Sequence, residues 1–196
     1  HFTEGQQDVD YVLTTTEVTR MIKEAGIDLS QIEPEALDMP FGLSSGAAAI
    51  FGVTGGVTEA VLRRLVHSSR MEDLQDISFT GIRGIEGIKE ASIQLEDRTV
   101  KIAVVNGLRC AETLLERIKA GEVQYDFVEV MACKRGCIAG GGQPVPIGPR
   151  TKQARLDGMY KIDSMAQIKR SDENPIIAEV YEGILKGKEH KLLHNR

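Results

Sequence analysis

Apolar residues recur at helical spacing near the start of the chain, and they predict a helix between Thr14 and Gly26. Thr14 and Glu17 have the spacing of a capping box, and Gly26 is a residue type that commonly ends helices. The apolar stripe repeats every three or four residues, at Val18, Met21, Ile22 and Ala25. The preceding apolar run from Val9 to Leu13 predicts a strand, so that the two segments form one strand–helix unit.

Alternating apolar and polar residues in the middle of the chain predict a β-hairpin with one exposed face. Its turn falls at residues 96–98. The apolar positions on the two sides of the turn are Ala91, Ile93 and Leu95, followed by Val100, Ile102 and Val104. The hairpin therefore adds an antiparallel pair to a sheet.

A helix and a buried strand are predicted after this hairpin. Asn106 and Gly107 open the helix and Gly121 closes it. Its apolar stripe is formed by Leu108, Ala111, Leu115 and Ile118. The strand runs from Tyr125 to about Met131, and a right-handed crossover makes it parallel to the second hairpin strand.

Two more helices complete the pattern. One follows Gly55 and Gly56, and the other starts at Asn174 and Pro175. Their apolar faces carry Val57, Val61 and Leu65 in the first helix and Ile177, Val180, Tyr181 and Ile184 in the second. Together the elements predict an α/β fold, a mainly parallel twisted sheet flanked by helices with an antiparallel hairpin strand.

Composition limits the classes of protein to which this chain can belong. The chain has 196 residues, 41% of them hydrophobic and 27% charged, which is enough for one good core. A net charge of −5 argues against a nucleic-acid surface. No apolar run approaches the roughly 20 residues of a membrane span. Three cysteines form no disulfide framework, so we expect a reducing, cytoplasmic location.

The candidate chemistry lies in the segment EVMACKRGCIAGGGQP, residues 129–144. It places Cys133 and Cys137 just beyond the predicted strand, at the end where α/β sheets carry their ligand sites. The glycine run 140–142 offers close backbone approach and free N–H groups, and Lys134 and Arg135 add positive charge that favours thiolates. Two thiolates so placed can share one metal centre.

Other interpretations of the cysteines remain open at this point. They could be inert core residues, because free cysteine often behaves as a small hydrophobe. A zinc site is a weaker interpretation of the two cysteines, since the chain has no second pair of cysteines. A redox disulfide would favour two intervening residues, and here there are three.

Several other residues have simple structural interpretations. Cys110 is expected in the core, and the run Arg150, Lys152 and Arg155 on a solvated face. His190 and His194 could bind a metal, but a solvated helix end is the stronger expectation. Gly55 and Gly56 could bind phosphate at a helix start, but no lysine of a phosphate-binding loop accompanies them.

The cysteine segment resembles the last of the three cysteine motifs of the iron-only (di-iron) hydrogenases. The resemblance continues upstream in SGAAAIFGVTGGVTEAVLRR, residues 45–64, and downstream in RLDGMYKID and KRSDENPIIAEVYEGIL, up to HKLLH at His194. Blocks in this order cover nearly the whole chain from about Asp10. One departure is Asp172, where many relatives have His.

The resemblance implies a reaction and a site. The family catalyses the reversible reduction of protons to hydrogen at a four-iron cubane (4Fe-4S) bridged to a di-iron unit with carbonyl and cyanide ligands. Cys133 matches a terminal cubane ligand, and Cys137 matches the cysteine whose sulfur bridges to the di-iron unit. Met131 and Phe51 match residues of the di-iron pocket, and Gly52 allows close approach.

The resemblance also implies missing parts. Two upstream motifs, resembling TSCCPxW and MPCTxKK, supply the other two cubane cysteines, and neither occurs here. We therefore expect one lobe of a two-lobed catalytic domain at residues 1–150, a helical tail at 151–196, and a fragment inactive alone. Expected partners are the missing amino-terminal lobe and ferredoxin or a nicotinamide-linked electron-transfer subunit. Two alternatives are a cytosolic iron–sulfur assembly factor without the di-iron unit and a sensory hydrogenase-like protein.

Overall fold

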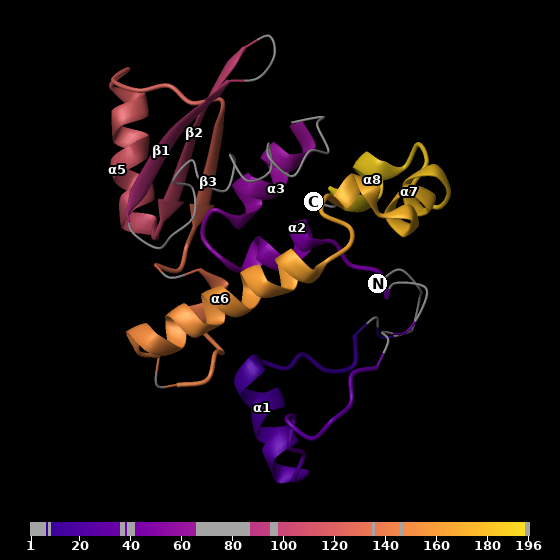
Figure 1. Cartoon of the computed structure of the whole chain (residues 1–196). Helices are drawn as coiled ribbons and strands as arrows, with labels where there is room; N and C mark the ends of the chain where they lie inside the picture. The colour runs from indigo at the N-terminus through magenta and orange to yellow at the C-terminus, as the bar shows by residue number, and fades with distance from the viewer. Residues whose placement is uncertain are drawn as a thin grey trace.

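A three-stranded sheet occupies one end of the molecule in this computed structural model (Figure 1). The structure describes residues 7, 9–35, 38, 42–65, 87–94, 98–134, 136–145 and 147–194. Strand β1 (Ile88–Gln94) pairs antiparallel with β2 (Thr99–Asn106), and β2 pairs parallel with β3 (Phe127–Met131). The predicted hairpin and the parallel pairing of β3 are confirmed. Residues 96 and 97 of the predicted turn at 96–98 lie outside the described residues. The α/β class is also confirmed, with a mixed sheet of one antiparallel and one parallel pair.

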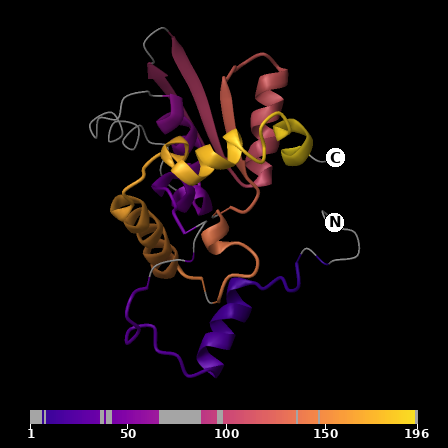
Figure 2. The same cartoon turned by 90° about the vertical axis from the view of Figure 1, so that its right-hand side faces the viewer.

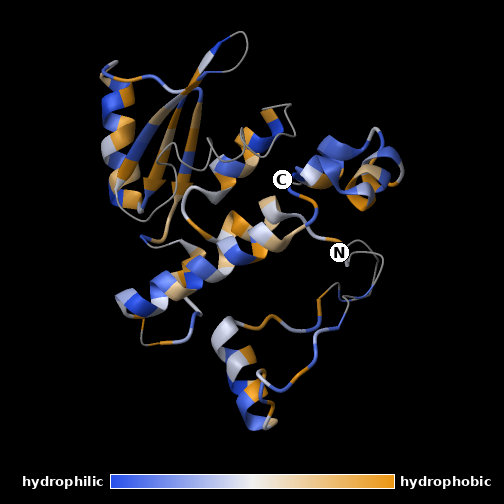
Figure 3. Ribbon diagram, viewed as in Figure 1, coloured by the Kyte–Doolittle hydropathy of each residue, from blue (hydrophilic) through white to orange (hydrophobic). Residues whose placement is uncertain are grey.

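Both faces of β2 are buried, which differs from the predicted hairpin with one exposed face. Helix α3 (Gly56–Leu65) covers one face, where Leu62 packs with Ile93, Val100, Ile102 and Val104. Helix α5 (Leu108–Lys119) covers the other, where Leu114 packs with Ala103 and Val105. Figure 3 shows hydrophobic residues along the strands and also on α3 and α5. Because helices cover both sides, β2 is apolar at successive positions from Ile102 to Val105 rather than at alternate ones.

Helix α5 has the predicted limits but faces the sheet with a different side. Leu108 and Leu115 of the predicted stripe are 64% and 54% exposed, whereas Leu114 is 2% exposed. Cys110 and Ala111 pack beside Leu114 against the sheet. The helix carries apolar residues on two adjacent faces, so spacing alone did not decide which face packs on the sheet.

The predicted strand from Val9 to Leu13 is wrong. The segment has no strand structure, and Tyr11 and Val12 are 85% and 88% exposed. Helix α1 (Thr15–Glu24) does form, with the Thr14–Glu17 capping box present. However, α1 has no buried residue, and it lies at the end of the molecule away from the sheet in both views (Figures 1 and 2). A strand needs a neighbouring edge, and the sheet does not extend to this segment.

A second hydrophobic core packs against the cysteine segment. It brings together the short helices α2 (Gly46–Ala49), η1 (Ile50–Gly52) and η2 (Cys137–Ala139) with the long helix α6 (Pro149–Met165). Its buried side chains are Ile50, Val53 and Ile138, and Leu156, Met159 and Tyr160 of α6 pack against them. Most of α6 lies within residues 151–196, where a helical tail was expected, but no apolar pattern predicted the limits of this helix.

The chain ends in short helices. They are η3 (Ser171–Glu173), α7 (Pro175–Glu182) and α8 (Glu189–Leu193). Asn174 caps α7 as expected, but the helix stops at Glu182, before Ile184 of the predicted stripe. None of the helices in the described part of the chain has the length and apolar content that crossing a bilayer requires.

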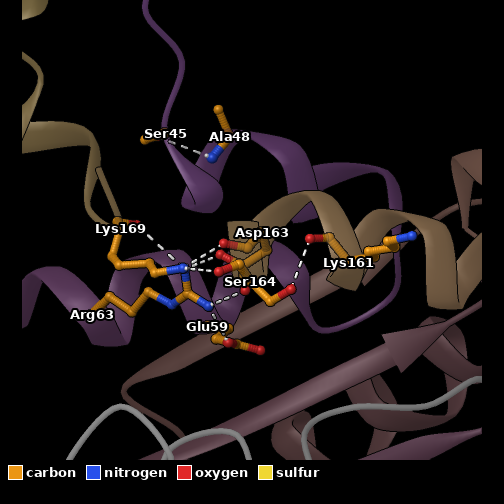
Figure 4. A network of polar contacts seen from close by, with 8 residues as sticks. All are labelled: Ser45, Ala48, Glu59, Arg63, Lys161, Asp163, Ser164 and Lys169. Carbon is orange, nitrogen blue, oxygen red and sulfur yellow. Dashed lines mark hydrogen bonds and ion pairs between the residues drawn. The ribbon is translucent and has the colours of Figure 1, made fainter. Parts of the chain in front are cut away.

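A buried ion network joins α3 to α6. The Arg63 guanidinium donates to both carboxylate oxygens of Asp163 at 2.7 Å and to Glu59 at 2.6 Å (Figure 4). All three residues are at most 5% exposed. Burial lowers the pKa of Arg63, but the hydrogen bonds and charges of Asp163 and Glu59 outweigh it and raise that pKa above its usual value. Arg63 is therefore charged, and it needs both carboxylates.

Removing one carboxylate from this network should destabilise the protein strongly. We expect Asp163→Ala to lower the free energy of unfolding by about 3–5 kcal/mol, because it leaves a buried cation short of a partner. Asp157→Ala is the matched control, since Asp157 is an exposed residue of the same helix bonded to Gln153. Its expected effect is within about 0.5 kcal/mol. Urea unfolding measures both, and equal losses would contradict a stabilising role for the buried pair.

Candidate metal site at the two exposed cysteines

Cys133 and Cys137 lie on one loop that leaves the carboxyl end of β3. Both thiols are free and exposed. The Gly136 amide donates to the Cys133 carbonyl at 3.1 Å, and the Gly140 amide donates to the Cys137 carbonyl at 3.3 Å. These turns bring the two cysteines into one short, hydrogen-bonded loop. Exposure of both thiols on this loop excludes the interpretation of inert core cysteines.

Glycines let this loop approach its surroundings closely. Gly136 has φ +69°, and a Cβ there would lie 3.0 Å from the Gly52 carbonyl oxygen. A Cβ at Gly140 would lie 3.2 Å from the Cys133 sulfur. Gly141, in contrast, has open space around its Cα. Gly136 and Gly140 are therefore needed for the loop's conformation and for room beside the thiol.

The other predicted site residues surround the loop only in part. Met131 is the half-buried last residue of β3, and Phe51 is a 48% exposed residue of η1. Gly52 and Cys137 line a common groove of about 480 Å³, together with Met159 of α6. Phe51, Met131 and Cys133 are not among the residues that line it. The structure thus places Gly52 and Cys137 in one groove that Phe51 and Met131 do not line.

Glu129 is a buried residue of β3 that sequence reasoning did not identify. Its carboxylate accepts hydrogen bonds from the Gly55 and Thr58 amides and from the Thr58 hydroxyl, each at 2.7 Å. A carboxylate at this position satisfies the first amides of α3 and interacts favourably with the helix dipole. It occupies the donors that a phosphate would need, so the phosphate interpretation of Gly55 and Gly56 is wrong. The signal in the sequence is a glutamate between two valines in a segment predicted to be a strand.

The local chemistry fits a metal–sulfur group. Two exposed thiols are soft ligands suited to iron–sulfur clusters. Gly140 leaves space beside Cys133, and the Thr54 hydroxyl, next to Gly136, is buried with no hydrogen-bond partner among the described residues. No group of three or more metal-binding side chains occurs in the part of the chain that the structure describes. The loop can therefore supply two ligands of a larger set.

Two other candidates are unrelated to this loop. His190 lies on α8 and His194 directly follows that helix, with ring centroids 5.0 Å apart. They belong to no three-ligand group among the described residues. Asp172 forms ion pairs with Arg170 at 2.9 Å and with Arg64 at 3.4 Å. Burial acts to raise the pKa of Asp172, but the hydrogen bonds and charge of Arg170 outweigh it, so this pKa is lowered. Asp172 therefore ties η3 to α3 as a carboxylate.

Alanine at Gly136 should destabilise the loop, whereas alanine at Gly141 should not. The positive φ at Gly136 costs an L-residue about 1–2 kcal/mol, and the Gly52 carbonyl adds crowding. We expect Gly136→Ala to lower the free energy of unfolding by at least that amount, and Gly141→Ala to change it by less than about 0.5 kcal/mol. Urea unfolding compares the two. Equal stability of the two variants would show that the loop does not need the conformation described.

Comparison with family models identifies two matched regions. Residues 1–141 match the model described as the C-terminal domain of the iron-only hydrogenase large subunit. Residues 149–196 match the model described as the iron hydrogenase small subunit. The first match covers well over half of the chain.

Similar proteins include hydrogenases and assembly factors. The chain is 41% identical to the NADP-reducing hydrogenase subunit HndD of Solidesulfovibrio fructosivorans, covering 97% of this chain and 33% of that protein. It is 38% identical to iron hydrogenase 1 of Clostridium pasteurianum, with 97% and 35% covered. It is 31% identical to the cytosolic iron-sulfur assembly component 3 of Mus musculus, with 97% and 41% covered. The chain thus spans about a third to two fifths of these relatives.

Solved structures agree with these matches. The HydA(deltaEFG) [FeFe]-hydrogenase structure superposes with a TM-score of 0.67 at 35% identity, over 94% of this chain and 54% of that one. A variant of HydA1 from Chlamydomonas reinhardtii gives 0.66 at 36% identity, over 91% and 52%. Family models, relatives and structures all lead to one assignment: the chain belongs to the iron-only hydrogenase family, as a carboxy-terminal part of the large subunit.

Proposed function

We propose that this chain is the cysteine-bearing lobe of an enzyme that reversibly reduces protons to molecular hydrogen. The observation that carries the proposal is the pair of exposed thiols, Cys133 and Cys137, on one loop directly after strand β3 of a family member. When bound, the four-iron cubane would relay electrons, and its di-iron unit with carbonyl and cyanide ligands would supply the metal chemistry.

Each site residue has a proposed role. Cys133 is a terminal ligand of the cubane, and Cys137 provides the sulfur that bridges to the di-iron unit. Met131 and Phe51 contribute apolar surface that excludes water from the di-iron ligands. Gly52 lacks a side chain where the backbone must come close, which agrees with its place beside Cys137 in the groove. Thiolate ligands suit such clusters, and burial and N–H donors around them tune the reduction potential.

The complete activity requires residues outside this chain. We propose that an upstream lobe of the same protein supplies the other two cubane cysteines, so this chain alone is inactive. Electrons come from ferredoxin or a nicotinamide-linked subunit, and the relative named as an NADP-reducing hydrogenase subunit supports the second. A cytoplasmic location is proposed from the cysteine content. One relative is named a periplasmic [Fe] hydrogenase large subunit, so the family occurs in more than one compartment.

The main alternative is a cytosolic iron–sulfur assembly factor that lacks the di-iron unit. Relatives with that name match 97% of the chain at 31–34% identity, compared with 38–41% for the named hydrogenases. Met131 and the complete GGGQP run also favour the enzyme. A sensory hydrogenase-like protein would share the site and differ in its fused domains.

The two cysteines should be separable by mutation in the full-length protein. We expect Cys137→Ser to abolish the infrared bands of carbonyl and cyanide, because the bridging sulfur is lost, while an altered cubane can still assemble. Cys133→Ser should damage the cubane first, seen as lower iron content and a lost or changed electron paramagnetic resonance signal. Neither change should disturb the fold strongly, because both thiols are exposed.

Cys110→Ser is the control, since Cys110 belongs to α5 and packs against the sheet beside Leu114, and it is not part of the cysteine loop. It should retain iron, both spectra and hydrogen turnover. Native infrared bands and wild-type turnover in Cys137→Ser would refute the bridging role. Absence of carbonyl and cyanide bands from the wild-type protein, with the cubane present, would favour the assembly factor.

A further inference from the structure

Arg155 of α6 contacts the cysteine loop directly. Its Nη1 donates to the Ile138 carbonyl at 2.7 Å, and its Nη2 donates to the Pro144 carbonyl at 2.9 Å. Ile138 immediately follows Cys137, and Pro144 follows the glycine run. One guanidinium therefore bridges the two ends of the segment that contains the three glycines. The expected solvated face is wrong for Arg155, which is only partly exposed.

The shape of arginine matters in this contact. A guanidinium presents N–H donors in a rigid, planar fork, so it can bond two carbonyls at once in a fixed geometry. A lysine carries the same charge on a flexible stem as a point donor and does not reproduce the fork. The glycine run has little conformational preference of its own. The two hydrogen bonds from Arg155 therefore restrict the backbone conformation of a segment whose glycines restrict it little.

Helix α6 also contacts this segment through apolar side chains. The Ile138 side chain is buried against Met159 and Leu156 of α6. Arg155, Cys137 and Gly52 line the same groove. Helix α6 therefore fixes the residue after Cys137 through both its carbonyl and its side chain.

This contact joins the two regions that the family models match separately. Arg155 lies within residues 149–196, the small-subunit match, and Ile138 lies within residues 1–141, the large-subunit match. We propose that Arg155 is a positioning residue for Cys137, and that through it the small-subunit segment takes part in the cluster site. The cluster part of this inference rests on the proposed function, whereas the loop part rests on the contacts alone.

Hydrogen exchange of the loop tests the positioning role without any cluster. The Gly140 and Gln143 amides are hydrogen-bonded within the loop and report its order. In the cluster-free full-length protein, Arg155→Lys should speed their exchange on the order of tenfold, about 1.4 kcal/mol, the size of one lost hydrogen bond to a charged group. Arg150→Lys, an exposed position on the same helix, is the matched control and should leave exchange unchanged. Unchanged exchange in Arg155→Lys would overturn the proposal.

The cluster-loaded protein gives the second readout. Arg155→Lys keeps the charge, so a shift in the midpoint potential and g-values of the four-iron cluster would come from altered geometry at Cys137. Arg150→Lys should keep wild-type values. Faster exchange together with wild-type potential and g-values would show that Arg155 holds the loop against α6 without affecting the cluster. That result would overturn the positioning role. A wild-type protein that binds no cluster would refute the proposed function, and the exchange result would still decide the loop contact.

Discussion

The buried charge of Arg63 is the constraint on which the arrangement of the other elements depends. Removing a guanidinium from water costs several kcal/mol unless carboxylates compensate it closely. Glu59 lies one turn away on the same helix, but Asp163 comes from α6, 100 residues later in the sequence. Gly46 of α2 has no space for a side chain beside Asp163. Satisfying Arg63 therefore fixes α2, α3 and α6 relative to one another.

A second buried carboxylate connects this group of helices to the sheet. Glu129 of β3 binds the first amides of α3, so the strand that leads into the cysteine loop also positions the helix that carries Arg63. From α6 the contacts return to the loop through Arg155 and the Ile138 side chain. The two thiols are thus exposed at the surface while the backbone around them is fixed by buried groups. This combination suits a metal site, which needs accessible ligands in a defined geometry.

Sequence patterns predicted the elements whose signals are local. The Thr14–Glu17 capping box, the Asn174–Pro175 helix start and the limits of α5 depend on residues close together in the chain, and all are present. A helical tail was expected at residues 151–196, but the limits of α6 were not predicted, because Gly158 and charged residues interrupt its apolar face; Pro149 at its first position was a usable signal. The roles of Glu129, Arg63 and Asp163 were also missed, because their partners lie 71 to 100 residues away. The cysteine loop was proposed as a site from the sequence because its residues are close together in the chain. The hydrogen bonds from Arg155 to this loop could not be predicted, because they depend on the packing of α6.

We propose above all that Cys133 and Cys137 together ligate one iron–sulfur cluster. The most direct measurement is a crystal structure of the anaerobically matured full-length protein, with anomalous diffraction recorded at the iron absorption edge. We expect iron peaks bonded to both sulfur atoms, with the Cys137 sulfur shared between the four-iron cluster and a second iron unit. Iron-loaded protein in which either sulfur has no iron bonded to it would contradict the claim.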